Sequence, residues 1–193
     1  MYEIGTFLTS FMKLYPKVFV HLEFRHFDEI YDLLLKEKID LGIVAYPDKR
    51  TKIEEIPYAQ DELVLIVGTN HRLSQKKSIS LEQINGEPFI AFGEGIPTRL
   101  AIDNILREKN IDVDIRMTNN NVFTLKKAVE AEVGVSLVPS ATVNEEVKNG
   151  TLKRIKINDV KMTRPLSILK LKSRKMSSPF KVFLEQLLKF EKG

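Results

Sequence analysis

The amino-acid sequence alternates between two hydrophobic periods, one of about 3.6 residues and one of two residues. Helices are predicted where apolar side chains recur at helical spacing, at residues 3–14, 28–38, 99–109, 140–149 and 180–188 and from Val122 onward. Strands are predicted where short apolar or alternating runs occur, at residues 18–24, 39–45, 53–59, 62–68, 88–92, 113–117, 135–138, 152–157 and 165–172.

The clearest unit of this pattern is the stretch of residues 118–139. Its three consecutive asparagines, Asn119 to Asn121, favour a turn and a helix cap, because their short amides can bond to free backbone N–H groups. The helix that follows is expected to end with Gly134 as a left-handed C-cap. The next strand is too apolar to face water and belongs inside an α/β sheet, where ligands bind at the carboxyl ends of strands. An ordinary helix–strand unit without a ligand explains the local pattern equally well.

The order of helices and strands also predicts the fold class. Helix, strand, helix and strand at short intervals in residues 3–45 predict parallel strands with crossover helices. A second run of this kind begins near residue 70. We therefore expect an α/β protein made of two small domains rather than one continuous sheet.

Composition narrows the protein class. With 193 residues, 43% of them apolar, the chain is long enough for a real core. It contains no cysteine, so disulfides and thiolate chemistry are excluded. The apolar runs are far too short to cross a bilayer, and the N-terminus lacks the pattern of a secretion signal. A soluble cytoplasmic protein without a membrane partner is the expectation.

The net charge of +4 is modest but unevenly distributed. Residues 148–193 carry 13 Lys and Arg against 3 Asp and Glu, a net +10, and the first 147 residues carry 17 against 23, a net −6. A basic end can mark contact with nucleic acid. These cations are scattered rather than clustered, so solvated faces of strands and helices are the favoured explanation.

The segment GEGIPTR, residues 93–99, carries the strongest candidate chemistry because it opens a predicted helix. The free N–H groups and the dipole of a helix N-terminus attract anions. Thr98 can cap the helix or bond a ligand oxygen, and Arg99 can bind a carboxylate or phosphate through two hydrogen bonds. A small anion is therefore the leading ligand class. The alternatives are a solvated or dimer-contact Arg99, a plain N-cap at Thr98, and a capping role alone for Asn120 and Asn121.

Catalytic and cofactor chemistry has little support in the sequence. The pair Gly93-x-Gly95 resembles a dinucleotide loop, but Thr98 fills the place of the third glycine. His21 and Glu23 could share one face of a strand, yet no third metal ligand is in register. No Gly-x-Ser-x-Gly elbow and no nucleophilic cysteine are present. We expect no cofactor, no metal site and no enzyme.

Several segments follow one another in a distinctive order over nearly the whole chain. They are FMKLYPKV (11–18), EKIDLGIV (37–44), DELVLIVGTNHRL (61–73), SLEQINGEPFIAF (80–92), GIPTR (95–99), TLKKAVEAEVGVSLVP (124–139), NGTL (149–152) and RPLSILKLKSRKMSSPFKVFLEQL (164–187). In this order and spacing the chain resembles the effector-binding domain of LysR-type transcriptional regulators. That domain shares its fold with type 2 periplasmic solute-binding proteins.

The resemblance implies two α/β subdomains joined by two crossing strands, a type 2 periplasmic-binding-protein-like fold. Subdomain I would comprise residues 1–69 and 166–193, and subdomain II residues 70–165. Family members carry a DNA-binding winged helix-turn-helix and begin this domain with a strand. Both are expected to be absent from this chain, because Met1 lies almost at the first helix. Glu132 stands where the family usually has glycine.

The implied function is ligand sensing. A small, anionic metabolite would bind between the subdomains and control DNA binding by the full-length protein. The implied ligand-binding residues are Val44, Ala45, Tyr46, Phe92, Gly93, Gly95, Ile96, Thr98, Arg99, Asn120, Asn121 and Pro139. The first helix, with Ile4, Phe7 and Phe11, is implied as the dimer interface of a homodimer or homotetramer, with burial inside its own domain as the alternative. A solute-binding protein of a transport system is the second candidate function.

Overall fold

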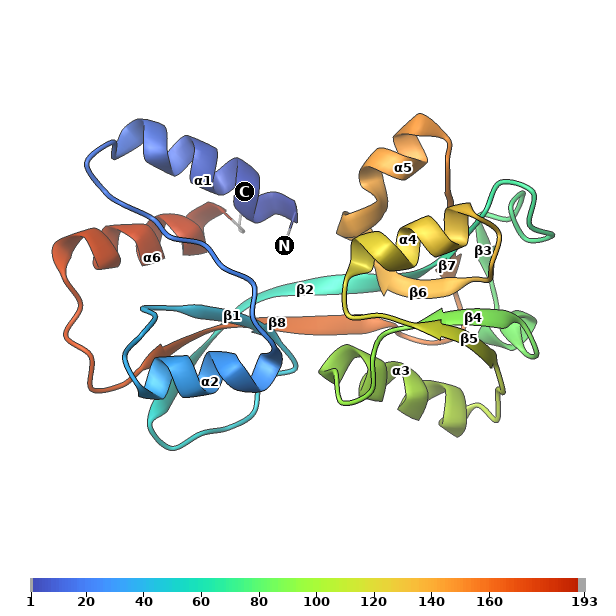
Figure 1. Ribbon diagram of the computed structural model, residues 1–193, viewed down its shortest axis with the longest axis horizontal. Helices are drawn as coiled ribbons and strands as arrows, with labels where there is room; N and C mark the ends of the chain where they lie inside the picture. Colours follow the sequence, from blue (N-terminus) through green and yellow to red (C-terminus); the bar gives the residue numbers. More distant parts are fainter. Residues whose placement is uncertain (1, 191–193) are drawn as a thin grey trace. The chain divides into compact units, whose positions relative to one another are not determined.

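A computed structural model describes residues 2–190 of the chain, shown in Figure 1. Residues 1 and 191–193, which the predicted subdomain I includes, lie outside the described residues. The chain forms two compact units, unit 1 from the residues up to Gln60 together with those from Pro165 onward, and unit 2 from Asp61 to Arg164. In both units helices pack on strands, so the prediction of an α/β fold is confirmed.

Unit 1 places three helices around a small sheet. Its helices are α1 (Tyr2–Leu14), α2 (Phe27–Leu35) and α6 (Ser178–Phe190), and its strands are β1 (Gly42–Ala45) and parts of β2 (Ile53–Val67) and β8 (Thr163–Leu171). Strand β8 lies between β1 and β2, and it pairs antiparallel with β1 so that Val44 faces Ser167. The prediction of parallel strands within residues 3–45 is wrong, because β1 is the one strand that the structure contains there.

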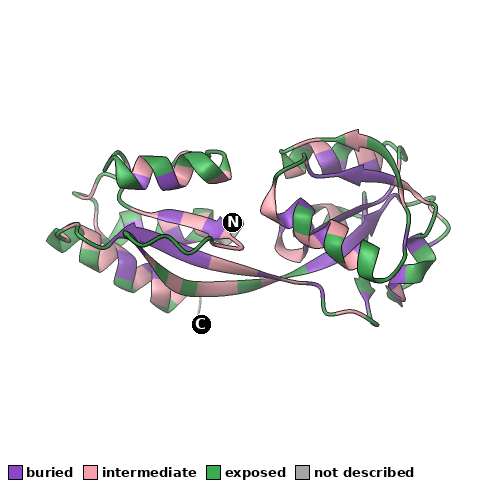
Figure 2. Cartoon of the chain, turned by 90° about the horizontal axis from the view of Figure 1, so that it is seen from below, coloured by how far each residue is buried: buried purple, intermediate pink, exposed green. Residues whose placement is uncertain are grey.

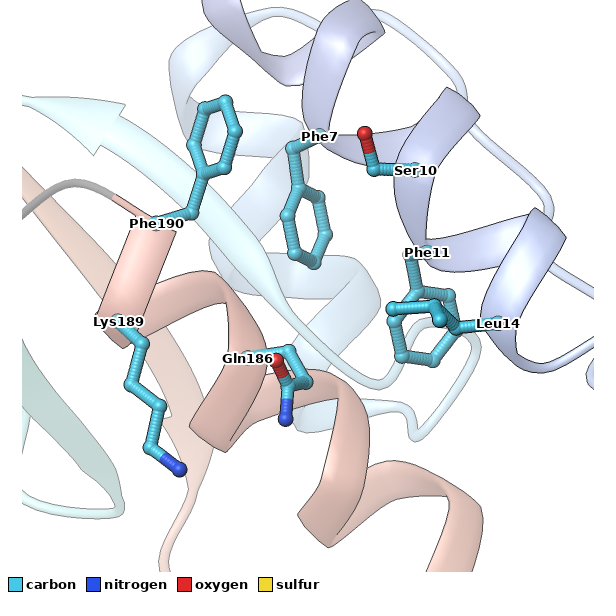
Figure 3. A pocket seen from close by; sticks show the side chains of 7 residues that line it. All are labelled: Phe7, Ser10, Phe11, Leu14, Gln186, Lys189 and Phe190. Carbon is cyan, nitrogen blue, oxygen red and sulfur yellow. The ribbon is translucent and has the colours of Figure 1, made fainter. Parts of the chain in front are cut away.

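Aromatic side chains hold α1 against α6. The ring of Phe7 meets that of Phe183 edge to face at 5.3 Å, and Phe11 meets the same ring at 4.9 Å. Such contacts add about 0.5–1.5 kcal/mol to the burial of the rings. A hollow of about 220 Å³ lies beside these rings. Figure 3 shows the side chains of both helices that line it. The helical stripe predicted from the sequence thus forms part of the core of unit 1.

The strand predicted at residues 18–24 is absent, and these residues have no regular structure. Val18 and Val20 are half-buried against the aromatic core, whereas Phe19 is 90% exposed and Phe24 72% exposed. The alternation therefore reflects one-sided burial. No strand among the described residues pairs with this segment, and a strand needs such a partner for its backbone N–H and C=O groups.

Strand β2 is one continuous strand, although the sequence predicted two. The predicted break coincides with polar residues near Gln60 and Asp61, but the backbone stays extended through them. After the buried Ile53, half-buried and exposed positions largely alternate through the first half, and Leu63–Val67 are then all buried. The second half is enclosed because β6 and β7 pair with it, both antiparallel. An unbroken apolar run is what such a central position requires.

Unit 2 contains most of the regular structure. Its elements besides β2 and β8 are β3 (Ser78–Ile79), η1 (Leu81–Ile84), β4 (Pro88–Ala91), α3 (Pro97–Glu108), β5 (Asp114–Thr118), α4 (Val122–Glu130), β6 (Ser136–Pro139), η2 (Ser140–Val143), α5 (Asn144–Asn149) and β7 (Lys153–Ile157). Strands β4 and β5 pair in parallel, and Phe89 of β4 forms a parallel bridge to Val135 just before β6. The predicted parallel strands with connecting helices are confirmed here. Figure 2 shows the buried residues gathered on these strands and on the facing sides of the helices.

Gly134 is not the left-handed cap of α4, so that prediction is wrong. Helix α4 ends at Glu130, and the residue with positive φ is Glu132, at 59°. A Cβ atom at Gly134 would lie 2.4 Å from the carbonyl oxygen of Pro88. Glycine at position 134 therefore allows the two backbones to approach closely. The N–H of the next residue, Val135, donates to the carbonyl oxygen of Pro88 at 2.8 Å.

A buried ion pair ties α4 to the segment after β6. Lys126 is 1% exposed, and its ammonium group donates to the carbonyl oxygen of Thr142 at 2.7 Å and to Oε1 of Glu146 at 2.5 Å. Oε2 of Glu146 is buried without a hydrogen-bond partner among the described residues. A buried ion pair adds little net stability as a whole. Removing one partner is nevertheless destabilising, because it leaves the other charge buried without compensation.

Lys126→Met should therefore lower the free energy of unfolding by about 3–5 kcal/mol, measured by urea denaturation. The double variant Lys126→Met, Glu146→Leu should recover most of this loss, because no charge then remains buried. Lys127→Met is the matched control, since the neighbouring Lys127 is exposed and makes only surface interactions, an ion pair with Glu130 and a cation–π contact with Phe123. It should change stability by less than about 1 kcal/mol. Equal effects of the two lysine variants would contradict this account.

Candidate functional site

Three chain segments of unit 2 end at one edge of its parallel strands. Strand β4 runs into the loop that begins at Phe92, β5 runs into the asparagine run, and β6 ends at Pro139. Because these strands run in the same direction, their carboxyl ends meet at the same edge. A helix begins after each of them: α3 after β4 and α4 after β5, both labelled in Figure 1, and the 3₁₀-helix η2 after β6. This is the edge at which α/β sheets bind ligands.

Hydrogen bonds to three consecutive carbonyl groups, those of residues 90–92, hold this edge in place. The oxygen of Ile90 accepts from the buried hydroxyl of Ser136 at 2.7 Å, and that of Ala91 accepts from the N–H of Asn119 at 3.1 Å. The oxygen of Phe92 accepts from Nη1 of Arg99 at 2.8 Å. Each bond leads to a different element, so the end of β4 is fixed from three sides.

The N-terminus of α3 offers free hydrogen-bond donors. Its N-cap is Ile96, which provides no side-chain cap, and Pro97 occupies the first turn. Within the described residues, no hydrogen bond occupies the backbone N–H groups of Thr98 and Arg99. The hydroxyl of Thr98 has no partner there either, although the residue is only 4% exposed. A plain capping role for Thr98, one of the two alternatives from the sequence, is therefore wrong.

Gly93 and Asn120 lie against each other across this edge. A Cβ atom at Gly93 would stand 2.0 Å from Oδ1 of Asn120, so only glycine leaves room for the amide. Gly95 turns the same loop with a positive φ of 78°. Two of the residues that the resemblance implied as ligand-binding are thus brought together, one from the loop before α3 and one from the loop before α4.

Asn121 is the N-cap of α4. Its side chain accepts from the N–H of Phe123 at 2.9 Å, and its own N–H donates to Oδ1 of Asn119 at 2.8 Å. The capping alternative is therefore observed for Asn121. Asn120 is exposed between them, and its side chain is not the cap.

Arg99 occupies a position that the sequence did not foresee. Its side chain is buried, and Nε lies 2.7 Å from both carboxylate oxygens of Asp103. The solvated or dimer-contact arginine considered from the sequence is not what the structure contains. Asp103 was missed, although its spacing of four residues from Arg99 on one helix is a recognisable signal for an ion pair.

In unit 1 the predicted ligand-binding residues lie at the end of β1. Val44 is buried in the core, Ala45 is half-buried, and Tyr46 has a positive φ of 50° and donates its N–H to the carbonyl of Pro165. Nearby, the hydroxyl of Tyr31 accepts from the N–H of Asp48 at 2.7 Å, and burial raises the pKa of Tyr31. The chain after β1 is thus held in a defined, locally strained conformation.

Of the residues implied as a dimer interface, Phe7 and Phe11 are buried inside unit 1 and Ile4 is half-buried. Burial within the domain, the alternative from the sequence, therefore applies to both phenylalanines. Met12 and Leu14 of the same helix are 51% and 70% exposed.

Within residues 2–190, no group of three His, Asp or Glu side chains is placed to hold a metal ion. In the same part of the chain, no helix is long and apolar enough to span a membrane.

Solved structures place this architecture among binding domains of the type 2 periplasmic-binding-protein-like class. The regulatory domain of CcmR from Synechocystis PCC6803, solved in complex with 2-PG, is 26% identical with a TM-score of 0.89, covering 100% of this chain and 92% of that one. The effector-binding domain of QuiR, solved in complex with shikimate, is 26% identical with a TM-score of 0.83, covering 98% and 90%.

The sequence identifies the family. The LysR substrate binding domain matches residues 3–191, and the chain belongs to this family. A probable RuBisCO transcriptional regulator of Chlorokybus atmophyticus is 31% identical over 97% of this chain and 62% of that protein. The chain thus spans about 62% of the length of this relative. The predicted family and the prediction that the chain is not an enzyme are confirmed, since the family is one of substrate binding domains.

Asn121→Ala should lower the free energy of unfolding by about 1 kcal/mol, because α4 loses its side-chain cap. Asn120→Ala is the matched control and should leave stability nearly unchanged, since its amide caps no helix. Urea denaturation of both variants gives the comparison. If Asn120→Ala proved the more destabilising substitution, the assignment of the cap to Asn121 would be wrong.

Proposed function

We propose that this chain is the ligand-sensing domain of a LysR-type transcriptional regulator and that it binds a small organic anion. The anion would be held by the donors at the carboxyl edge of unit 2. The main support is the start of α3, where two backbone N–H groups and the Thr98 hydroxyl have no partner within the described residues.

The chemistry of these donors favours negative charge. A helix N-terminus carries about half a positive elementary charge, and free N–H groups there bind phosphate or carboxylate oxygens. Both ligands named for the similar solved domains, 2-phosphoglycolate and shikimate, carry acidic groups. A phosphorylated or carboxylated metabolite of that size is therefore the expected effector class.

Binding would act through a conformational equilibrium. The effector can bias the domain only by the difference between its affinities for two states. In a homodimer or homotetramer this bias would alter how DNA-binding domains elsewhere in the full-length protein are presented. Such a regulator would act in the cytoplasm, where its DNA is. Family membership favours this role over that of a solute receptor in transport.

A thermal-shift screen of phosphorylated and carboxylated metabolites tests the ligand class. An effector present at a hundred times its dissociation constant should stabilise the domain by about 2.7 kcal/mol. The screen should include 2-phosphoglycolate and glycolate, which differ only in the phosphate group. Stabilisation by neutral sugars but by no anion would refute the proposed class.

Thr98→Val tests the role of the hydroxyl, because valine keeps the shape of the side chain and removes its donor. Affinity for the anion found in the screen, measured by calorimetry, should fall about tenfold, as for the loss of one hydrogen bond to a charged group. Thr9→Val on the exposed face of α1 is the control and should not change affinity. Unchanged affinity in Thr98→Val would remove this hydroxyl from the site.

A further inference from the structure

Arg99 and Asp103 form a connection between helix α3 and the strand that precedes it. Nε of Arg99 lies 2.7 Å from both Oδ1 and Oδ2 of Asp103, and Nη1 donates to the carbonyl oxygen of Phe92 at 2.8 Å. Arg99 is only 8% exposed, so these charge-assisted bonds are formed largely away from water, where they are strong. The first turn of α3 is thereby tied to the residue that follows β4.

This connection determines the direction of one particular N–H group. The described residues contain no cis peptide bond, so the Phe92–Gly93 peptide is trans. In a planar trans peptide the C=O and the following N–H point in opposite directions. Since the guanidinium of Arg99 holds the Phe92 carbonyl on its own side, the N–H of Gly93 must point away from Arg99.

The N–H of Gly93 is a free donor. Within the described residues it makes no hydrogen bond, and Gly93 is half-buried without a side chain to cover its backbone. The amide of Asn120 occupies the space where a Cβ atom of Gly93 would stand. A buried or half-buried N–H without a partner is uncommon, because it loses its bond to water without replacement. A ligand oxygen would supply the missing acceptor.

We infer that Arg99 is a positioning residue, which together with Asp103 orients the Gly93 N–H toward an anionic ligand. This inference rests on the proposed function. Direct contact between Arg99 and the anion is disfavoured by Asp103, whose carboxylate already neutralises the guanidinium and would repel a second anion beside it. The positive end of the site is then formed by backbone N–H groups, and the arginine sets their direction.

The first test uses the free protein and ¹H–¹⁵N NMR of the Gly93 amide. Arg99→Lys keeps the charge but replaces the two separate nitrogens that bond Asp103 and Phe92, Nε and Nη1, by a single one. Asp103→Asn leaves the guanidinium without its anionic partner. Both variants should shift the Gly93 resonance and speed its hydrogen exchange. Arg107→Lys, on the exposed side of the same helix, is the control and should change neither. An unchanged Gly93 amide in both Arg99→Lys and Asp103→Asn would overturn the inference.

The second test measures affinity for 2-phosphoglycolate by calorimetry, with thermal midpoints recorded to confirm that each variant is folded. Arg99→Lys and Asp103→Asn should each weaken binding about tenfold. The double variant should bind no more weakly than either single variant, because both substitutions break the same connection from Asp103 through Arg99 to Phe92. Weaker binding in Arg99→Lys with unchanged or tighter binding in Asp103→Asn would instead mean direct contact, which contradicts the inference. If the unmodified protein bound no anion, the proposed function would be refuted. The NMR comparison would then still show whether Arg99 orients the Gly93 N–H group.

Discussion

The parallel pairing of β4 with β5, and with the chain entering β6, is the constraint on which the candidate site depends. It brings three strand ends to one edge of unit 2, and each strand is followed there by a helix or 3₁₀-helix. The positive ends of helix dipoles and free N–H groups are thereby concentrated in one place. This arrangement can attract an anion without using a charged side chain as the ligand-binding group. Gly134 makes this possible, because its missing side chain lets Val135 reach the backbone of β4.

The same edge is fixed by hydrogen bonds within the protein itself. Side chains or backbone groups from three different elements occupy the carbonyl oxygens of Ile90, Ala91 and Phe92. A site whose donors are already oriented avoids part of the ordering cost of binding. This explains why buried polar residues such as Ser136 and Arg99 occur where a core would otherwise be apolar, since their bonds hold the geometry of neighbouring groups.

The sequence predicted the α/β class and most elements, because long periodic runs such as Phe180–Leu188 and the apolar run of β2 report burial directly. It failed where pairing matters. Residues 18–24 alternate like a strand, yet alternation records which side chains are buried and not whether a neighbouring strand exists. The prediction of a left-handed cap at Gly134 also failed. Both a close backbone approach and a positive φ favour glycine, so the sequence alone does not distinguish between them. At the site, the helix start and the cap at Asn121 were recognisable, whereas the hydrogen bond from Arg99 to Phe92 depends on tertiary geometry.

Membership in the LysR substrate binding domain family and the geometry of unit 2 lead to the same conclusion about the chemistry of the effector. The central claim is that an anion is bound by backbone N–H groups at the carboxyl edge of unit 2. A crystal structure of the domain with such an anion tests it most directly. The account predicts ligand oxygens within hydrogen-bond distance of the N–H groups of Gly93 and Thr98. An anion held elsewhere, with both groups still unbonded, would contradict it.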